Sequence, residues 1–223
     1  MARLIVTIDG PAASGKSTVA RLLARKLGAT FLDTGAMYRA VTFAAMQAGV
    51  DLSNEDDLIK LLDENDFNFK LTKSKTSVCV NGTDITDKIR TPSVTANAKY
   101  IASVPNVRKR LVRLQRQIAA EHDKIVTEGR DQGTVAFPDA AIKFYLDASS
   151  KERAKRRQLD LGSLNSKAAI KQVTKAIEAR DKRDQTRKVG ALKCAGDAIV
   201  VDTTKVDAKT VVEHLLSCIA KNA

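Results

Sequence analysis

The sequence predicts an α/β fold in which a mostly parallel sheet of about five strands is covered by helices on both faces. Short apolar runs alternate with longer segments whose apolar residues recur at helical spacing. The first run, Leu4–Ile8, leads through a glycine-rich turn into a helix, as the first strand of a parallel β-α unit does. The 223 residues, 43% hydrophobic and 29% charged, suit a single globular domain.

The first third of the chain alternates strands and helices. Two helices are expected before residue 53, and a glycine ends each of them, Gly28 the first and Gly49 the second. Ser53 is the expected N-cap of a third helix that runs to about Asn65, because Asp56 stands at its third position. The elements expected before Ser53 are the strand Leu4–Ile8, the helix Lys16–Leu27, the strand Thr30–Leu32 and the helix Ala36–Ala48.

Residues 67 to 85 change to short alternating segments of the kind found in strands. The expected strands are Phe67–Leu71, Ser77–Val80 and Thr83–Ile85. Asn81-Gly82 joins the last two as a two-residue hairpin turn. We therefore predict a small antiparallel β insertion.

Helices and strands alternate again after the insertion. Pro105 separates the first two of these helices. The expected elements are the helices Ser93–Ser103 and Val107–Glu121, the strands Ile125–Thr127 and Ile142–Leu146, the basic helices Ser150–Leu161 and Ser166–Arg187, the strand Ala198–Val201 and the helix Ala208–Ile219.

The net charge of +12 is unevenly distributed, since residues 143–193 hold fifteen Lys and Arg against six Asp and Glu. Such asymmetry indicates a polyanionic partner. With 4% aromatic residues and no Trp, the chain has few platforms for stacking on single-stranded nucleic acid, which favours small phosphates. The three cysteines are too few and too scattered for a disulfide framework or a zinc site. Without a leader or a long apolar run, we expect a cytoplasmic protein with no membrane partner.

One motif predicts a nucleotide site. Residues 10–17, GPAASGKS, fit the pattern G-x-x-x-x-G-K-[ST] between a predicted strand and a predicted helix, which is the context the motif requires. In such a loop the N–H groups and the helix N-terminus surround phosphates, Lys16 bridges the β and γ phosphates, and the Ser17 hydroxyl helps to hold Mg²⁺. The expected phosphate-binding residues are Gly10, Pro11, Ala12, Ala13, Ser14, Gly15, Lys16, Ser17 and Thr18.

A second set of charged residues suggests a phosphorylated acceptor. Residues 33–39, DTGAMYR, begin at the end of a strand, where ligands of open α/β sheets bind, and place Arg39 one turn into a helix. Gly129-Arg130-Asp131 also follows a strand. Arg180, Asp184 and Arg187 share one helix face, and Arg153, Arg156 and Arg157 form a basic cluster suited to a lid. These residues favour a kinase over a bare NTPase.

Residues 204–207, TKVD, resemble the guanine-reading element of regulatory GTPases. The chain has no D-x-x-G element to serve as the γ-phosphate switch of that class. We therefore expect a turn before the last helix, with Asp207 as its cap.

Taken in order, these motifs resemble bacterial cytidylate kinases, a family of nucleoside monophosphate kinases, over nearly the whole chain. The family also carries an insertion in its acceptor-binding region, which matches Phe67–Ile85. The resemblance rests on Ile8–Ser17 (IDGPAASGKS), Asp33–Arg39 (DTGAMYR), Ile89–Thr91 (IRT), Pro105–Arg108 (PNVR), Gly129–Asp139 (GRDQGTVAFPD), Leu146–Arg157 (LDASSKERAKRR) and Arg180–Arg187 (RDKRDQTR).

The resemblance implies that ATP, with Mg²⁺, phosphorylates CMP or dCMP. It implies catalytic roles for Lys16, Arg153 and Arg157. It assigns the CMP phosphate to Arg39, Arg130 and Arg187, the ribose to Arg180 and Asp184, the cytosine edge to Arg108 and Asp131, and further CMP contacts to Asp33, Thr34, Tyr38 and Gly129. Where the family commonly has a small hydroxyl residue for base contact, this chain has Lys99, which cannot accept a hydrogen bond.

The family pattern divides the single three-layer P-loop kinase domain into three regions. These are a core (1–35, 122–149 and 188–223), an acceptor-binding region with the β insertion (36–121) and a lid (150–187). We expect a monomer without a nucleic-acid partner. The alternatives are another small P-loop kinase, for adenylate, uridylate or shikimate, and a nucleic-acid-associated NTPase whose affinity falls steeply with salt.

Overall fold

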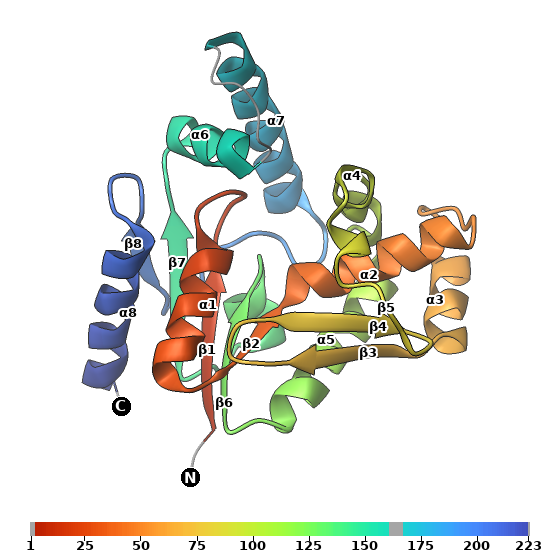
Figure 1. Cartoon of the computed structure of the whole chain (residues 1–223), viewed down its shortest axis with the longest axis horizontal. Coiled ribbons are helices and arrows are strands. Elements are labelled where there is room, and N and C mark those ends of the chain that lie inside the picture. Colours follow the sequence, from red (N-terminus) through yellow and green to blue (C-terminus); the bar gives the residue numbers. More distant parts are fainter. Residues whose placement is uncertain (1–2, 161–166, 223) are drawn as a thin grey trace.

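A computed structural model describes residues 3–160 and 167–222 and contains a five-stranded sheet in which every neighbouring pair is parallel. Figure 1 shows helices on both sides of this sheet, so the prediction of an α/β fold is confirmed. The order across the sheet is β2 (Thr30–Asp33), β6 (Lys124–Glu128), β1 (Leu4–Asp9), β7 (Ile142–Asp147) and β8 (Ile199–Asp202).

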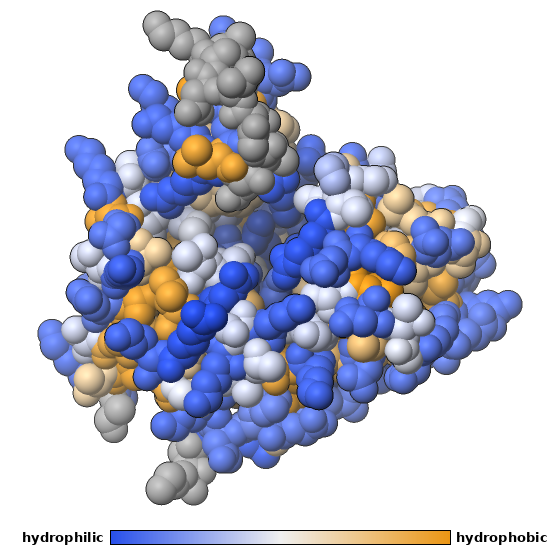
Figure 2. Space-filling model, viewed as in Figure 1, coloured by the Kyte–Doolittle hydropathy of each residue, from blue (hydrophilic) through white to orange (hydrophobic). Residues whose placement is uncertain are grey.

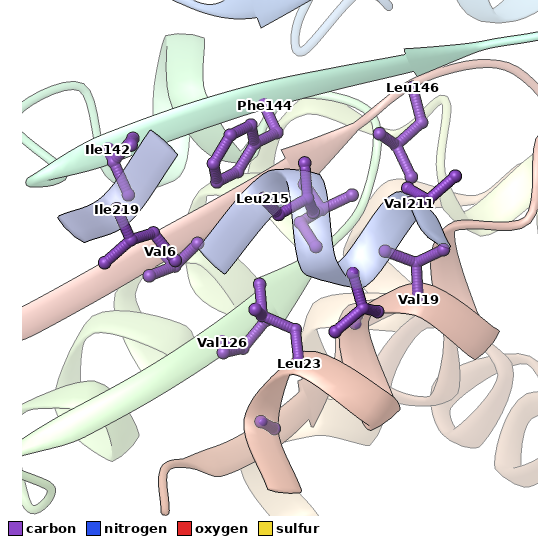
Figure 3. Packing of buried hydrophobic residues seen from close by; sticks show 14 of the residues in the cluster. Val6, Val19, Leu23, Val126, Ile142, Phe144, Leu146, Val211, Leu215 and Ile219 are labelled. Atoms are coloured by element: carbon purple, nitrogen blue, oxygen red, sulfur yellow. The ribbon is translucent and has the colours of Figure 1, made fainter. Parts of the chain in front are cut away.

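The two faces of the sheet bury alternate residues of each strand. Phe31 and Val126 belong to one apolar cluster, whereas their neighbours Leu32 and Ile125 belong to another. Helices α1 (Lys16–Leu27) and α8 (Ala208–Asn222) pack against the first face, and α2 (Thr34–Gln47) and α5 (Pro105–Ala120) against the second. Figure 3 shows the first cluster, with Val19, Leu23, Val211, Leu215 and Ile219 facing Val6, Val126, Ile142, Phe144 and Leu146.

The β insertion forms as the sequence predicts. Strands β3 (Phe67–Leu71), β4 (Thr76–Val80) and β5 (Thr83–Asp84) make an antiparallel sheet, with Asn81 and Gly82 at φ 49° and 76° in the turn between the last two. Val78 and Ile85 pack on Ala36 and Ala40 of α2, together with Ile89 from the short helix η1 (Lys88–Arg90). The insertion is thereby attached to the helix that follows β2.

Two of the predicted helix starts are wrong, each for its own local reason. Asn54, not Ser53, caps α3 (Glu55–Glu64), accepting hydrogen bonds from the N–H groups of Asp56 and Asp57, while the Ser53 hydroxyl bonds Asp51. Pro105 does not lie between helices but begins α5, where its missing N–H costs nothing. The helix before it, α4, spans Pro92–Ile101.

Helices α6 (Ser150–Asp160) and α7 (Lys167–Thr186) pack on each other and stand beyond the carboxyl ends of the strands (Figure 1). The predicted boundaries at Leu161 and Ser166 lie outside the described residues. In Figure 2 the surface is hollowed between these helices and α4, and mostly hydrophilic residues surround the hollow. Within 3–160 and 167–222, no helix is long and apolar enough to cross a membrane.

We predict that Leu215→Ala lowers the free energy of unfolding by about 2–5 kcal/mol, because Leu215 is fully buried between α8 and the sheet. Leu159→Ala is the matched control, since Leu159 is 70% exposed and should cost little. Urea denaturation followed by circular dichroism measures both. Equal losses of unfolding free energy in the two variants would contradict the burial of Leu215 between α8 and the sheet.

Candidate active site

The parallel sheet brings acidic and glycine-rich strand ends to one edge. β1 ends at Asp9, β2 at Asp33 and β6 at Glu128, and Asp33 pairs with Glu128 across the β2–β6 ladder. All three carboxylates are buried. The segments that follow these strands carry the motifs singled out in the sequence, so the fold alone places those motifs around one edge.

The phosphate-binding loop follows β1 and leads into α1. Gly10 adopts φ +146°, and a Cβ there would lie 2.0 Å from the carbonyl oxygen of Leu146, so only glycine fits. The Lys16 amine donates to the carbonyl of Pro11 and, at 3.3 Å, to the Ser14 hydroxyl. Burial, and next the charge of Arg130, lowers the pKa of Lys16. A buried ammonium held by neutral oxygens suits an anionic ligand.

Asp9 fixes the segment after β6. Its carboxylate accepts hydrogen bonds from the backbone N–H groups of Gln132, at 2.9 Å, and Gly133, at 2.7 Å. These residues begin η2 (Gln132–Ala136), a single turn of π-helix that the sequence does not predict. Burial raises the pKa of Asp9 to about 6, although both hydrogen bonds act in the opposite direction.

Asp33 caps α2 and gathers two arginines. It accepts the Ala36 N–H at 2.9 Å and pairs with the Nη2 atoms of Arg39, at 3.1 Å, and Arg90, at 3.2 Å. Burial by itself would raise the pKa of Asp33, but the two guanidinium groups outweigh it and lower the pKa. Nearby, the Thr34 hydroxyl donates to the carbonyl of Glu128 at 2.6 Å. Arg90 is missing from the predicted site residues, and its only sequence signal is its place in the segment 89–91.

Asp184 gathers the second pair of arginines. Its carboxylate contacts Arg130 Nε at 3.0 Å and also Arg187 Nη2. Although burial opposes this, Arg130 and Arg187 lower the pKa of Asp184. Loss of hydration in the cleft, and then the charges of Arg130, Arg157 and Arg39, lowers the pKa of Arg180 to about 10. Arginines predicted from four separate segments of the chain therefore influence one another in a single cleft.

Asp131 is the third carboxylate that binds an arginine, after Asp33 and Asp184. It pairs with Arg108, and both side chains are at most 4% exposed. The Arg108 guanidinium lies 5.0 Å from the centroid of the Tyr38 ring and donates to the carbonyl of Ala102 at 3.1 Å. Arg108 Nε and the Tyr38 hydroxyl are buried with no hydrogen-bond partner among residues 3–160 and 167–222. Gly190 covers this pair, since a Cβ there would lie 2.2 Å from Arg108 Nη2 and from Asp131 Oδ2.

Glu128 is a site residue that sequence reasoning missed. Burial, and then the charge of Asp33, raises its pKa, while Lys16 and a hydrogen bond from the Ser17 hydroxyl lower it. The carboxylate thus stands between the phosphate-binding loop and the acceptor arginines. Its position as the last residue of β6, directly before Gly129, is the signal that could have identified it.

The lid arginines differ in their surroundings. Arg153 is buried and donates to the carbonyls of Ala12, at 3.1 Å, and Ala148, at 2.9 Å. Arg156 donates to Thr203, whose hydroxyl also donates to the carbonyl of Ser14 at 3.0 Å. Arg157 is partly exposed. Thr203, like Arg90 and Glu128, is a residue that sequence reasoning missed.

Two further sequence features are explained by local contacts. Asp207 caps α8, accepting the N–H groups of Lys209 at 2.8 Å and Thr210 at 3.1 Å, so the expectation for residues 204–207 is confirmed. Lys99 is exposed on α4, with its amine 4.8 Å from the centroid of the Tyr100 ring. Its amine is therefore engaged by a neighbour on the same helix.

A glycine loop after the first strand, a two-helix lid and a second group of arginines across the cleft define a P-loop kinase whose acceptor is itself anionic. The family model for cytidylate kinase matches residues 6–221. The chain belongs to the cytidylate kinase family.

Curated relatives agree over nearly full length. Cytidylate kinase of Lactobacillus johnsonii is 42% identical over 97% of this chain and 94% of that protein, and cytidylate kinase of Rhodopirellula baltica is 44% identical over 96% and 91%. Cytidylate kinase of Pseudomonas savastanoi pv. phaseolicola is 45% identical over 97% and 95%.

Solved structures share the fold at lower identity. An uncharacterized protein of Eubacterium ventriosum has a TM-score of 0.54 at 14% identity, covering 98% of this chain and 99% of that one. A protein of Thermus thermophilus has a TM-score of 0.51 at 19% identity, covering 97% and 98%.

We predict that Gly190→Ala is more destabilising than Gly28→Ala by about 1–3 kcal/mol, because the new methyl group overpacks the Arg108–Asp131 pair. Gly28 is a matched control, since both glycines have φ +65° but a Cβ at Gly28 meets nothing within 4 Å. Urea denaturation measures the difference. Equal losses would mean that backbone strain alone sets the cost at Gly190.

We predict that the natural protein loses about 2 kcal/mol of stability relative to Asp9→Asn as pH rises from 4 to 7. The raised pKa means that the folded protein holds a proton on Asp9 between about pH 4 and 6 that the unfolded chain has lost, so ionisation in this window destabilises the fold. Denaturation of both proteins across this pH range tests it. Parallel pH profiles would show that Asp9 titrates normally.

Proposed function

We propose that the chain transfers the γ-phosphoryl group of ATP to CMP or dCMP, giving ADP and CDP or dCDP. The observation that carries this proposal is the arginine cluster opposite the phosphate-binding loop in a chain of the cytidylate kinase family. A bare NTPase needs no second set of phosphate-binding groups. A kinase whose acceptor carries its own phosphate needs such a second set.

On the donor side, the loop Gly10–Ser17 and Thr18 at the first turn of α1 would hold the ATP phosphates with backbone N–H groups and the Lys16 amine. Mg²⁺ fits here because the Ser17 hydroxyl lies beside Glu128, whose pKa is raised by burial and by Asp33. Hydroxyl and carboxylate oxygens suit Mg²⁺, which takes its other ligands from phosphates and water. When bound, Mg²⁺ neutralises charge on the transferring phosphates.

On the acceptor side, Arg39, Arg130 and Arg187 would hold the CMP phosphate. Each is already held by a carboxylate, so the incoming phosphate meets guanidinium groups of fixed position. Arg180 and Asp184 would hold the ribose. Asp33, Thr34, Tyr38 and Gly129 would complete the pocket, chiefly by supporting the arginines and the strand ends.

Arg108 and Asp131 would read the cytosine edge. Cytosine offers an N4 donor beside N3 and O2 acceptors, which suits a carboxylate next to a guanidinium, whereas uracil has an oxygen at position 4 that would face Asp131. The unpartnered Arg108 Nε and Tyr38 hydroxyl supply further hydrogen-bonding capacity beside this pair. We assign Lys99 no contact with the base; its amine lies against the Tyr100 ring.

The chemistry requires positioning and charge neutralisation. The CMP phosphate is already an anion near neutral pH, so its oxygen attacks in line without a general base. Lys16 and the arginines would spread the negative charge that gathers as two anions approach. Arg157, whose charge acts on Arg180, would act on the phosphates from the lid, and Arg153, which contacts the loop, would act beside it.

The three regions of the single domain would have separate roles. The core (1–35, 122–149 and 188–223) would bind ATP, residues 36–121 would bind CMP, and residues 150–187 would form the lid. We propose that the enzyme works in the cytoplasm as a monomer on small nucleotides, with no nucleic-acid or membrane partner.

The direct test is ADP formation from Mg·ATP with CMP, dCMP, UMP and AMP in parallel, beside a control without acceptor. Strong turnover with CMP and dCMP alone is the expected result. Acceptor-independent hydrolysis, or preference for another monophosphate, would overturn the assignment. A Lys16→Ala variant should lose orders of magnitude in kcat and serves as the inactive control.

We predict that Asp131→Asn lowers the ratio of kcat/KM for CMP to that for UMP by roughly 10-fold or more, since a carboxylate that accepts from cytosine N4 becomes an amide that also donates. Steady-state kinetics with both acceptors gives the ratio. An unaltered ratio would show that cytosine is read elsewhere.

A further inference from the structure

The lid binds both backbone polar groups of Ala12, a residue of the phosphate-binding loop. The N–H of Ala12 donates to Asp181 Oδ1 at 3.1 Å, and the carbonyl of Ala12 accepts from Arg153 Nη1 at 3.1 Å. Asp181 belongs to α7 and Arg153 to α6, and their side chains pair with each other. Three segments far apart in the sequence therefore meet at Ala12.

These contacts are buried, and they use most of the polar atoms of both side chains. Arg153 and Asp181 are 6% and 7% exposed. Besides Ala12 and Asp181, Arg153 contacts the carbonyl of Ala148 at the end of β7 and the Ser150 hydroxyl at 3.3 Å. A buried, fully hydrogen-bonded ion pair is sensitive to the loss of either partner, because the remaining charge is left without compensation.

The loop needs such support at this point. Ala13, the next residue, has φ 60°, a left-handed conformation that is strained for a residue with a Cβ. Nothing in the local sequence favours glycine-like geometry there, so the surroundings must hold it. The clamp, made by Asp181 and Arg153 on the N–H and carbonyl of Ala12, fixes the chain immediately before the strained residue.

We propose that Asp181 is a positioning residue that, with Arg153, holds the backbone of Ala12 in the conformation that binds the ATP phosphates and makes this conformation depend on the lid. The inference rests on the proposed donor role of the loop. Lid opening breaks the clamp and loosens the loop, and lid closure restores it. Asp181 contacts the loop backbone and not the acceptor arginines, so its effect falls on the donor site.

The test compares Asp181→Asn with Glu178→Gln. Both variants remove one negative charge from α7, but Glu178 is exposed one turn before Asp181 and has no ion pair within the described residues. The readouts are the Kd of a non-hydrolysable ATP analogue, the KM for ATP and for CMP, the melting temperature, and hydrogen exchange in residues 9–19. Arg153→Lys keeps the positive charge but loses the forked geometry, and tests the same clamp from α6.

We expect Asp181→Asn to weaken analogue binding roughly 10-fold, to raise the KM for ATP accordingly with little change in the KM for CMP, and to speed exchange in residues 9–19. Arg153→Lys should shift the same quantities, and Glu178→Gln none of them. A lower melting temperature with unchanged analogue binding, or equal changes in both KM values, would overturn the proposal. The Arg153–Asp181 pair would then stabilise the lid without positioning the loop.

The analogue measurement separates this proposal from the proposed function. If the natural protein binds the analogue but does not phosphorylate CMP, the acceptor assignment fails while the effect of Asp181→Asn on analogue binding still decides the role of the clamp. If CMP is phosphorylated and analogue binding is unaffected, only the clamp fails.

Discussion

The repulsion between cationic side chains gathered in one cleft is the constraint on which the rest of the structure depends. Arg39, Arg90, Arg108, Arg130 and Arg187 line the acceptor side, and each is held by a carboxylate, Asp33, Asp131 or Asp184. Without these acids the buried charges would destabilise the fold. With these acids, the cleft is assembled before a substrate arrives. An incoming anion meets guanidinium groups that are already oriented, and it only has to replace or share their aspartate partners.

The parallel sheet makes this arrangement possible. All five strands of the core end at the same edge, so Asp9, Asp33 and Glu128 become neighbours although they lie far apart in the chain. Each also serves the backbone or the loop beside it. Asp33 caps α2, Asp9 holds the first turn of η2, and Glu128 faces the Ser17 hydroxyl. The acids that shape the fold are therefore the acids that set the electrostatics of the site.

The lid belongs to the same electrostatic network. Asp184 on α7 joins Arg130 from the core to Arg187 at the end of the helix, and Asp181, one turn earlier, reaches the phosphate-binding loop with Arg153. One helix thus contacts both the donor loop and the acceptor arginines. Movement of the lid changes the surroundings of both substrates together, which suits an enzyme that must exclude water before a phosphoryl group leaves ATP.

The sequence by itself determined the elements and the class of chemistry. Apolar periodicity predicts the strands and helices, the turn at Asn81-Gly82 predicts the β insertion, and residues 10–17 predict the nucleotide loop, because each signal is local. Tertiary structure alone decided the pairing of charges between distant segments. Arg90, Glu128 and Thr203 were missed, and the partners of Asp181 and Arg153 could not be foreseen, because contacts over 28 to 189 residues depend on the order of the strands and the docking of the lid. The start of α3 was also undecided, because the adjacent residues Ser53 and Asn54 can both serve as an N-cap. The backbone geometry selects Asn54.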